Sequence, residues 1–269
     1  MKKRFWYLGS ILLVMLVFMT ACGSNSNSSS SSLKKIQNKG TLTVGMISSN
    51  PPYEYQVNKD GKQETKGADV KLIKKIAKKL GVKYKIKTMD MDGLLPAVQS
   101  GKVDMLVTSL SPTAERKKGA TFSKVYFRST NTLVVRKSDL NKYNKNINNL
   151  SESSIAVINN STQQPMIEKK FPNAKLTKFS KVTDLALALN NNKVDAFSID
   201  VPTATILLRQ NPKLAMTSWR HKDASSGAAV AMSKSTTKDL IKKVNQVVSS
   251  NKSNYEKWVQ QAAKNVPTN

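Results

Sequence analysis

The sequence predicts a protein of the α/β class, built from two similar α/β lobes with a ligand cleft between them. Two observations predict this fold. A strand–helix–strand pattern occurs once in the first half of the chain and once in the second, and a helix–turn–strand segment recurs 91 positions further on. A chain of 269 residues is long enough for two domains, and a hydrophobic content of 39% is enough to build their cores.

The amino terminus has the order of residues expected of a secretory signal peptide over residues 1–21. Three basic residues, 2–4, precede the apolar run 5–18. The residues that end in Cys22 resemble the lipobox of bacterial lipoproteins, in which the cysteine is acylated and becomes the first mature residue. We therefore expect Cys22 to carry a lipid. The alternative is an uncleaved transmembrane anchor with an ordinary cysteine.

Residues 22–32 are expected to form a flexible tether, because residues 23–32 are all glycine, serine or asparagine and cannot bury apolar surface. Removal of the signal peptide lowers the formal net charge from +27 to +24, since it takes away three basic residues and no acidic one. Lysines alternate with apolar residues over 72–80, which indicates the solvated face of an amphipathic helix. No nucleic-acid motif accompanies the charge, so we expect no nucleic-acid partner.

The strands and helices of the two strand–helix–strand units are predicted from hydrophobic periodicity. Alternating or short apolar runs indicate strands, and apolar residues at helical spacing indicate helices. Gly81 is the expected end of the first helix. The elements expected, in order, are a strand at 42–47, a helix at 70–80 and a strand at 84–88, and then a strand at 155–158, a helix at 165–170 and a strand at 175–179.

A helix–turn–strand segment follows each unit. Residues 94–107 form the first copy and residues 185–198 the second. Both copies carry Lys-Val-Asp at the start of the strand, which puts Asp104 and Asp195 91 positions apart. A chance similarity of two ordinary segments is the alternative. The constant offset favours duplicated lobes, in which both aspartates have structural roles.

The carboxyl ends of the two repeated strands predict a polar cleft, because parallel sheets bind ligands beyond these ends. Ser109 stands at one end and Asp200 at the equivalent position of the other. After the first end, Ser111 is expected to cap a short helix that begins at Pro112, with Arg116 about one turn in.

These cleft residues match the two charges of a free α-amino acid. The guanidinium of Arg116 can hold a carboxylate with two hydrogen bonds, and free N–H groups at a helix start add to it. A second polar loop, 159–163, lies between a strand and a helix of the other lobe. Asp200 supplies a negative charge for an ammonium group. The sequence therefore predicts a site for a small molecule that carries both charges.

Seven short segments carry a resemblance to a known family: Pro52–Tyr55, Gly67–Val70, Gly101–Asp104, Ser109–Arg116, Ser161–Gln163, Asp195–Phe197 and Asp200. Taken in order, they resemble the polar amino-acid substrate-binding proteins of ABC importers, a two-lobed periplasmic-type family. The resemblance covers about residues 33–265. It implies a type II periplasmic-binding-protein fold with two hinge crossings. One lobe would be residues 33–130 and 218–269, and the other residues 131–217.

The resemblance also implies roles for candidate site residues: Arg116, Ser111 and Thr162 would hold the ligand carboxylate, and Ser109 and Asp200 its ammonium group. We also expect Ser161 to contact the ligand. The residues expected to line the side-chain pocket are Asn50, Tyr53, Met91 and Ile158. An ABC permease would be the partner of this monomeric protein, which would lie on the outer face of a cell membrane of the Gram-positive type. We expect no cofactor and no metal, since one cysteine and one histidine leave no multi-cysteine or multi-histidine metal site.

Departures from the family pattern bear on the ligand side chain. Ile47 stands where lysine- and histidine-type binders place an acid, and Asn50 where the family often has an aromatic residue. Asp200 is committed to the ammonium group, so a cationic side chain would have no counter-ion. We expect an uncharged amino acid, such as glutamine, or cystine. Asn160 replaces a usual glycine, and we expect the loop to keep its shape because asparagine tolerates left-handed backbone.

Other readings of single residues stay open. Asp69 precedes a helix and is expected to be its N-cap. Tyr53 is as compatible with packing at the rim as with ligand contact, and His221 is expected at the surface or near a hinge. Two other functions are alternatives. One is a dehydratase-type enzyme on the same fold, for which the cleft offers no acid–base pair. The other is an adhesin whose basic surface binds anionic wall or host polymers.

Overall fold

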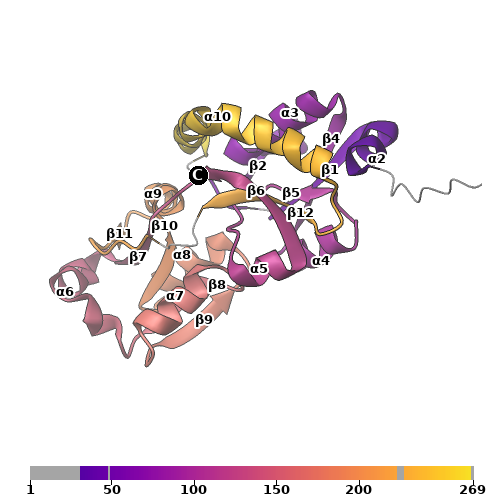
Figure 1. Ribbon diagram of the computed structural model, residues 1–269. Helices are drawn as coiled ribbons and strands as arrows, with labels where there is room; N and C mark the ends of the chain where they lie inside the picture. Colours follow the sequence, from indigo (N-terminus) through magenta and orange to yellow (C-terminus); the bar gives the residue numbers. More distant parts are fainter. Residues whose placement is uncertain (1–30, 48, 223–226, 268–269) are drawn as a thin grey trace, which may run out of the picture. The chain divides into compact units, whose positions relative to one another are not determined.

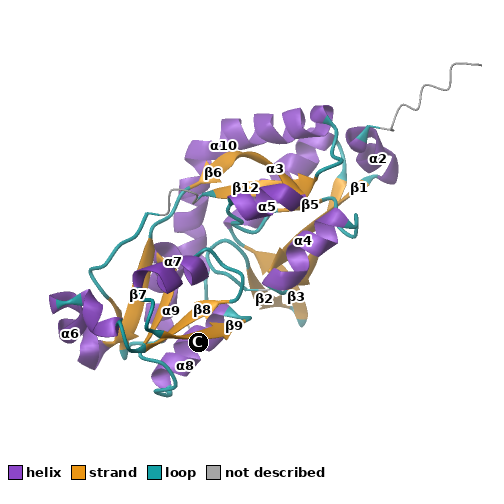
Figure 2. Ribbon diagram, turned by 60° about the horizontal axis from the view of Figure 1, so that its bottom comes forward, coloured by secondary structure: helices purple, strands orange, loops and turns teal. Residues whose placement is uncertain are grey.

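Two five-stranded sheets with helices packed against them form the framework of the chain, together with a separate two-stranded hairpin (Figures 1 and 2). The structure, a computed structural model, describes residues 31–47, 49–222 and 227–267. The expected signal peptide, Cys22 and most of the expected tether lie outside these residues. None of the helices in the described part of the chain is long and apolar enough to cross a membrane.

The first sheet consists of β1 (Thr41–Ile47), β4 (Lys83–Met89), β5 (Met105–Leu106), β6 (Ala120–Phe127) and β12 (Ala228–Ser233). Its strand order is β4-β1-β5-β12-β6, with β4 and β5 parallel to β1 and with β12 antiparallel to β5 and β6. The elements that belong with this sheet are called the first half below, although β12 and α10 come from the end of the chain. Its other elements are α2 (Ser32–Lys39), α3 (Ala68–Leu80), α4 (Met91–Gln99), α5 (Ala114–Gly119), α10 (Lys238–Asn265) and the hairpin of β2 (Tyr55–Lys59) and β3 (Lys62–Lys66).

The second sheet consists of β7 (Asn131–Arg136), β8 (Ser154–Ile158), β9 (Lys175–Phe179), β10 (Ala196–Asp200) and β11 (Leu214–Met216). Its order is β11-β7-β10-β8-β9, with β9 and β10 parallel to β8 and with β7 antiparallel to its neighbours. Its helices are α6 (Leu140–Lys145), α7 (Gln163–Lys170), α8 (Val182–Asn190) and α9 (Val201–Gln210), with 3-10 turns η1 (Lys137–Asp139) and η2 (Ile147–Leu150).

The two sheets share an arrangement that confirms the predicted α/β fold of two similar lobes. Three parallel strands stand side by side in each, β4-β1-β5 in one and β9-β8-β10 in the other, and an antiparallel strand follows. Helices connect the parallel strands in the same order. β5 is shorter than the expected 102–107, although Asp104 N and Val107 N still donate to carbonyls of β1 on either side of it.

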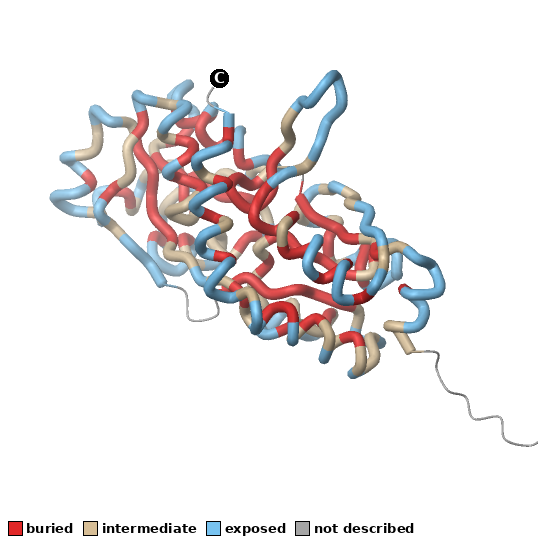
Figure 3. Tube along the Cα trace, turned by 90° about the horizontal axis from the view of Figure 1, so that it is seen from above, coloured by how far each residue is buried: buried red, intermediate tan, exposed pale blue. Residues whose placement is uncertain are grey.

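The inner strands of the two sheets consist mostly of buried residues, as in β1, β8 and β10, which is why they read as nearly continuous apolar runs (Figure 3). The edge strands β4 and β9 are lysine-rich and partly exposed. In β1, alternate residues Leu42, Val44 and Met46 pack in a core with α3 and α10, whereas Ile47 packs in a second core with α4. Two cores likewise enclose the second sheet, one with α8 and α9 and the other with α6 and α7.

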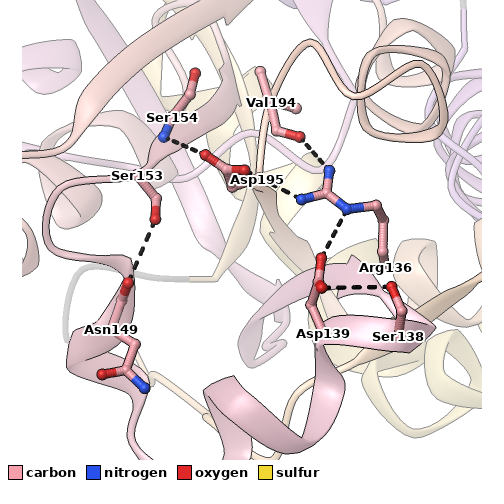
Figure 4. Close-up of polar contacts among 8 residues, drawn as sticks. All are labelled: Arg136, Ser138, Asp139, Asn149, Ser153, Ser154, Val194 and Asp195. Carbon is pink, nitrogen blue, oxygen red and sulfur yellow. Dashed lines mark hydrogen bonds and ion pairs between the residues drawn. The ribbon is translucent and has the colours of Figure 1, made fainter.

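Asp104 and Asp195 have equivalent structural roles in the two sheets. The Asp104 carboxylate accepts a hydrogen bond from Thr43 N at 2.6 Å, and the Asp195 carboxylate accepts one from Ser154 N at 2.9 Å (Figure 4). In each case the aspartate backbone N–H donates back, to Thr43 O and to Ser154 O, both at 2.8 Å. Each aspartate therefore fixes the register between its strand and the central parallel strand.

Each of these aspartates also pairs with a basic side chain. Lys39 of α2 approaches Asp104 at 2.6 Å, and Arg136 of β7 approaches Asp195 at 3.1 Å. Arg136 is held in turn by Asp139 at 2.7 Å (Figure 4). The aspartates of the repeated Lys-Val-Asp are thus structural in both halves, as the sequence predicts.

The chain crosses between the sheets twice, from β6 to β7 and from β11 back to β12. The two crossings are hydrogen-bonded to each other, because Asn131 N donates to His221 O at 2.9 Å and His221 N donates to Asn131 O at 3.0 Å. His221 lies at this junction with an exposed side chain, and Trp219 stacks on its ring.

The first described helix begins inside the segment expected as a tether. Ser31 is the N-cap of α2, and its hydroxyl also donates to Asp239 at the start of α10. Ser32 N donates to Thr237 at 2.8 Å. Composition alone missed this end of the tether because serine is also a favourable N-cap, and its partners lie more than 200 positions away.

Candidate ligand-binding site

A cavity of about 100 Å³ is lined by residues from both halves of the chain. A water molecule needs about 10–15 Å³ of such space, so the cavity has room for a small molecule. All nine residues predicted as ligand contacts line it: Asn50, Tyr53, Met91, Ser109, Ser111, Arg116, Ser161, Thr162 and Asp200. Ile158, predicted as a lining residue, lines it as well.

The wall from the first sheet is fixed by hydrogen bonds around Ser109, which follows β5 with left-handed backbone (φ 46°). Ser109 N donates to the Asp69 carboxylate at 2.6 Å, and Asn50 Nδ2 donates to Ser109 Oγ at 3.0 Å. Asn50 is itself held by its backbone N–H, which donates to Glu54 O at 2.7 Å. This wall is therefore preorganised by the first half of the chain.

Helix α5, which carries Arg116, begins later than the sequence suggested. Its N-cap is Thr113, whose hydroxyl accepts a hydrogen bond from Arg116 N at 3.2 Å. The prediction that Ser111 caps the helix and that Pro112 is its first residue was wrong. A serine and a threonine two residues apart are both acceptable caps, and local sequence does not distinguish them.

The Arg116 side chain joins the two halves of the site. Its guanidinium donates to Ser111 O at 3.1 Å and, across the cavity, to Asn160 O at 2.6 Å. Burial lowers the pKa of Arg116 from its usual value, but an arginine remains protonated in proteins. A guanidinium has five N–H donors, so Arg116 can hold both carbonyls and also donate to an anion in the cavity.

The loop after β8 supplies hydroxyl groups on the opposite wall. Asn160 has left-handed backbone (φ 55°), which confirms that asparagine serves where the family usually has glycine. Ser161 Oγ is buried and has no hydrogen-bond partner among the described residues. Thr162 precedes α7 without making a capping hydrogen bond through its side chain. Both hydroxyls are therefore available to a ligand.

Asp200 is a half-buried acid whose hydrogen-bond partners among the described residues are neutral. It caps α9, accepting from Thr203 N at 3.2 Å and from Thr203 Oγ1 at 2.9 Å. The Tyr53 hydroxyl, from the first half of the chain, donates to it at 2.8 Å. Burial raises the pKa of Asp200, and the hydrogen bonds oppose that rise. A cationic group in the cavity would supply the opposite charge.

Among the described residues that line the cavity, the charged ones are one cation and one anion, Arg116 and Asp200. The rest of the described lining is neutral. Its apolar residues include Ile47, Met91, Phe127, Ile158 and Val182. The cavity thus combines one positive end, one negative end and an uncharged remainder.

Sequence reasoning missed several residues of the site. Asp69 is not the N-cap of α3, because Gly67 holds that position and the Asp69 carboxylate is buried against Tyr126, Tyr255 and Ser109 N. Polar lining residues that it did not single out are Thr108, Ser129, Asn131, Gln163 and Ser180. Gln163 lies in one of the segments that resemble the family, and Thr108 directly precedes another, so the sequence contained a signal for these two residues. Asn131 and Ser180 carry no local signal.

The family profile of bacterial extracellular solute-binding proteins, family 3, matches residues 42–261. The chain belongs to this family. Among relatives of this family-3 protein, the probable histidine-binding protein of Campylobacter jejuni is 32% identical over 232 residues, covering 86% of each chain. The ABC transporter glutamine-binding protein GlnH of Bacillus subtilis is 27% identical over 278 residues, covering 96% of this chain and 98% of GlnH.

A solved structure gives the same result for the fold of this family-3 protein. It is an amino acid ABC transporter substrate-binding protein from Streptococcus pneumoniae, crystallised with L-arginine. The identity is 31% and the TM-score 0.83, over 87% of this chain and 98% of the other. The chain therefore has the type II periplasmic-binding-protein fold that the sequence predicts.

Proposed function

We propose that this family-3 protein is the substrate-binding component of an amino-acid ABC importer, which captures one free α-amino acid and delivers it to the permease. The observation that carries the proposal is the pairing of Arg116 and Asp200 in one small cavity. A free α-amino acid presents a carboxylate and an ammonium group on one carbon. The names of the relatives, which are amino-acid-binding proteins of ABC transporters, support the same class of ligand.

Each end of the ligand has a proposed set of partners. The carboxylate would bind the guanidinium of Arg116, the loop at Ser111 and the hydroxyls of Ser161 and Thr162. The unpartnered, buried Ser161 Oγ supports this set, because a buried hydroxyl is most stable when it is hydrogen-bonded. The ammonium group would bind Asp200 and Ser109.

The side chain of the ligand is proposed to be uncharged. The residues expected around it, Asn50, Tyr53, Met91 and Ile158, carry no charge at neutral pH, and Asp200, the one acid among the described lining residues, is needed for the ammonium group. Relatives named for histidine and for glutamine, and a neighbour crystallised with arginine, indicate that family membership alone leaves the side chain open. Uncompensated burial of a cationic side chain costs several kcal/mol, so the neutral lining favours glutamine or cystine.

The proposed capture step is closure of two lobes, residues 33–130 with 218–269 and residues 131–217. The strands of the two sheets divide along these boundaries, which supports the division. Arg116 and Asp200 approach the ligand from different lobes. Only the closed form can therefore satisfy both of its charged ends.

The proposed location is the outer face of the cell membrane, with the protein monomeric and anchored by a lipid on Cys22. The order of residues 1–22 supports this part of the proposal. The segment from Cys22 to Ser30 would connect the anchor to α2. Neither a dehydratase reaction nor adhesion is favoured, because the relatives described above are binding proteins of transporters.

A thermal-shift screen of the mature protein with the twenty amino acids and cystine tests the proposal. A ligand at 100 times its Kd should add about 2.7 kcal/mol to the free energy of unfolding. We expect stabilisation by an uncharged amino acid or by cystine, and its loss in Arg116→Ala but not in Lys118→Ala, which removes the same charge from an exposed position of α5. Stabilisation by arginine or lysine alone would refute the side-chain assignment. Stabilisation by no amino acid would refute the function.

A further inference from the structure

Two carboxyl groups lie buried together behind the cavity wall. Glu54 and Asp69 both have 0% exposed surface, and their carboxyl groups accept hydrogen bonds from consecutive residues of the wall, Glu54 from Thr108 Oγ1 and Asp69 from Ser109 N. Each carboxyl group also changes the pKa of the other. Two neighbouring carboxylates that are shielded from water repel each other strongly when both are charged, which favours a pair that holds one proton.

Asp69 has the surroundings of a carboxylate. Its Oδ1 accepts hydrogen bonds from the hydroxyls of Tyr126 at 2.8 Å and Tyr255 at 2.6 Å, and its Oδ2 accepts from Ser109 N at 2.6 Å. Several donors directed at one carboxyl group stabilise its charged form. Burial raises the pKa of Asp69, and these hydrogen bonds oppose that rise.

Glu54 has the surroundings of a neutral acid. Its Oε1 accepts one hydrogen bond, from Thr108 Oγ1 at 2.6 Å, and Thr108 Oγ1 accepts one from Ile47 N at 3.1 Å. Its Oε2 is buried and finds no donor among the described residues. A protonated Oε2 would instead be a donor, with the Asp69 carboxylate as its acceptor.

The charges around the pair also favour a charged Asp69 and a neutral Glu54. Burial raises the pKa of Glu54 well above 4.5, and the negative charges of Asp69 and Asp200 raise it further, while the Thr108 hydroxyl opposes the rise. The phenols that act on Asp69 come from β6 and α10, and Tyr53 lies close enough to respond to Asp69 and Asp200.

We propose that Glu54 is protonated at neutral pH and donates to Asp69, and that this pair is a positioning device for the cavity wall at Thr108 and Ser109. Glu54 holds the Thr108 hydroxyl, and Asp69 holds the Ser109 N–H. The positioning of the cavity wall by this pair rests on the proposed function, because Ser109 is proposed to contact the ligand. The location of the proton on Glu54 does not depend on the proposed function.

The shared proton has a thermodynamic consequence. Above the usual glutamate pKa of 4.5, an unfolded chain releases this proton while the folded chain keeps it. The folded state then binds one more proton, so its stability falls as pH rises, until the raised pKa of Glu54 is passed. One such proton changes the unfolding equilibrium constant about tenfold per pH unit.

Urea unfolding of the wild type and of Glu54→Gln between about pH 5 and 7 tests the location of the proton. Glutamine keeps an acceptor for Thr108 and a donor for Asp69. The unfolding constant of the wild type should therefore rise about tenfold more per pH unit than that of Glu54→Gln. Glu64→Gln, the same change at an exposed position of β3, should keep the wild-type dependence. Equal pH dependence in wild type and Glu54→Gln would overturn the proposal.

Infrared spectroscopy of the wild type at pH 7 is a second measurement that needs no variant to fold. A C=O stretch of a protonated carboxyl group is expected, and its absence would contradict a neutral Glu54. For the positioning role, Glu54→Gln should keep ligand affinity within about threefold, whereas Glu54→Leu, which loses both hydrogen bonds, should weaken it about tenfold or more. Equal affinities of the two variants would refute that role. Neither the urea nor the infrared result depends on a ligand.

Discussion

Single residues of the site could be predicted where a short segment carries them. Ser109 and Asp200 were expected where two strands end, and Arg116 lies shortly after Ser109. Local sequence was therefore enough to predict that all three line one cavity. The role of Asp69 could not be predicted in this way. Its partners Tyr126 and Tyr255 lie 57 and 186 positions away, and an aspartate at a helix start looks like a cap.

Arg116→Lys is expected to weaken ligand binding nearly as much as Arg116→Ala. An ammonium group cannot reproduce a bidentate clamp on a carboxylate, nor donate to Ser111 O and Asn160 O from one planar fork. Each variant should lose about 2–5 kcal/mol of binding free energy. Calorimetry with the ligand found in the screen measures this loss. Wild-type affinity in either folded variant would place the carboxylate elsewhere.

Helices and strands were predictable in position, because their periodicity is local. α3 and β8 begin within two residues of the expected positions, and the repeated helix–turn–strand segment recurs as α4–β5 and α8–β10. Element ends were less predictable. The start of α5 depends on which of two hydroxyl residues accepts Arg116 N, and the start of α2 depends on contacts with α10.

Asp104→Ala and Asp195→Ala are expected to destabilise the protein by similar amounts. Each removes the acceptor of a backbone N–H that fixes strand register, Thr43 N in one sheet and Ser154 N in the other. A hydrogen bond of this kind contributes about 1–2 kcal/mol. Urea unfolding of both variants checks the values, with Asp184→Ala at a partly exposed position of α8 as the control. A large effect from one variant and none from the other would contradict equivalent roles.

Contacts between distant segments determine how the whole molecule presents its cavity. Asp92 accepts hydrogen bonds from the side chains of Asn159 and Asn160, 67 and 68 positions away, and Tyr53 donates to Asp200 across 147 positions. Periodicity contains no information on such pairs. The internal repeat and the family resemblance supplied the two-lobed arrangement but not these contacts, which join the sheet-containing halves at the cavity.

Ligand binding is expected to contract the molecule, because closure brings Arg116 and Asp200 to one ligand. Small-angle scattering of the mature protein, with and without saturating ligand, measures the change in radius of gyration. Asp92→Ala loses the contacts with Asn159 and Asn160, so it should need more ligand for the same contraction. An unchanged radius at saturation in the wild type would argue against closure by a hinge.

Cys22→Ser is expected to release the protein into the medium without a change in ligand affinity. The lipid is proposed to be the membrane anchor, and the segment after Cys22 separates it from the cavity. Fractionation of cells that express either form, followed by calorimetry of the released protein, gives both readouts. Equal membrane retention of the two forms would favour an uncleaved anchor.

Recognition of both charged ends of one amino acid is tested most directly by calorimetry with three matched compounds. These are the amino acid that gives the largest stabilisation in the screen, its α-amide and its deaminated acid. We expect one amino acid to bind per chain, and each analogue to bind at least about 30-fold more weakly, because each leaves Arg116 or Asp200 without its charged partner. Affinities of both analogues within about threefold of the amino acid would contradict a site built on that pair of charges.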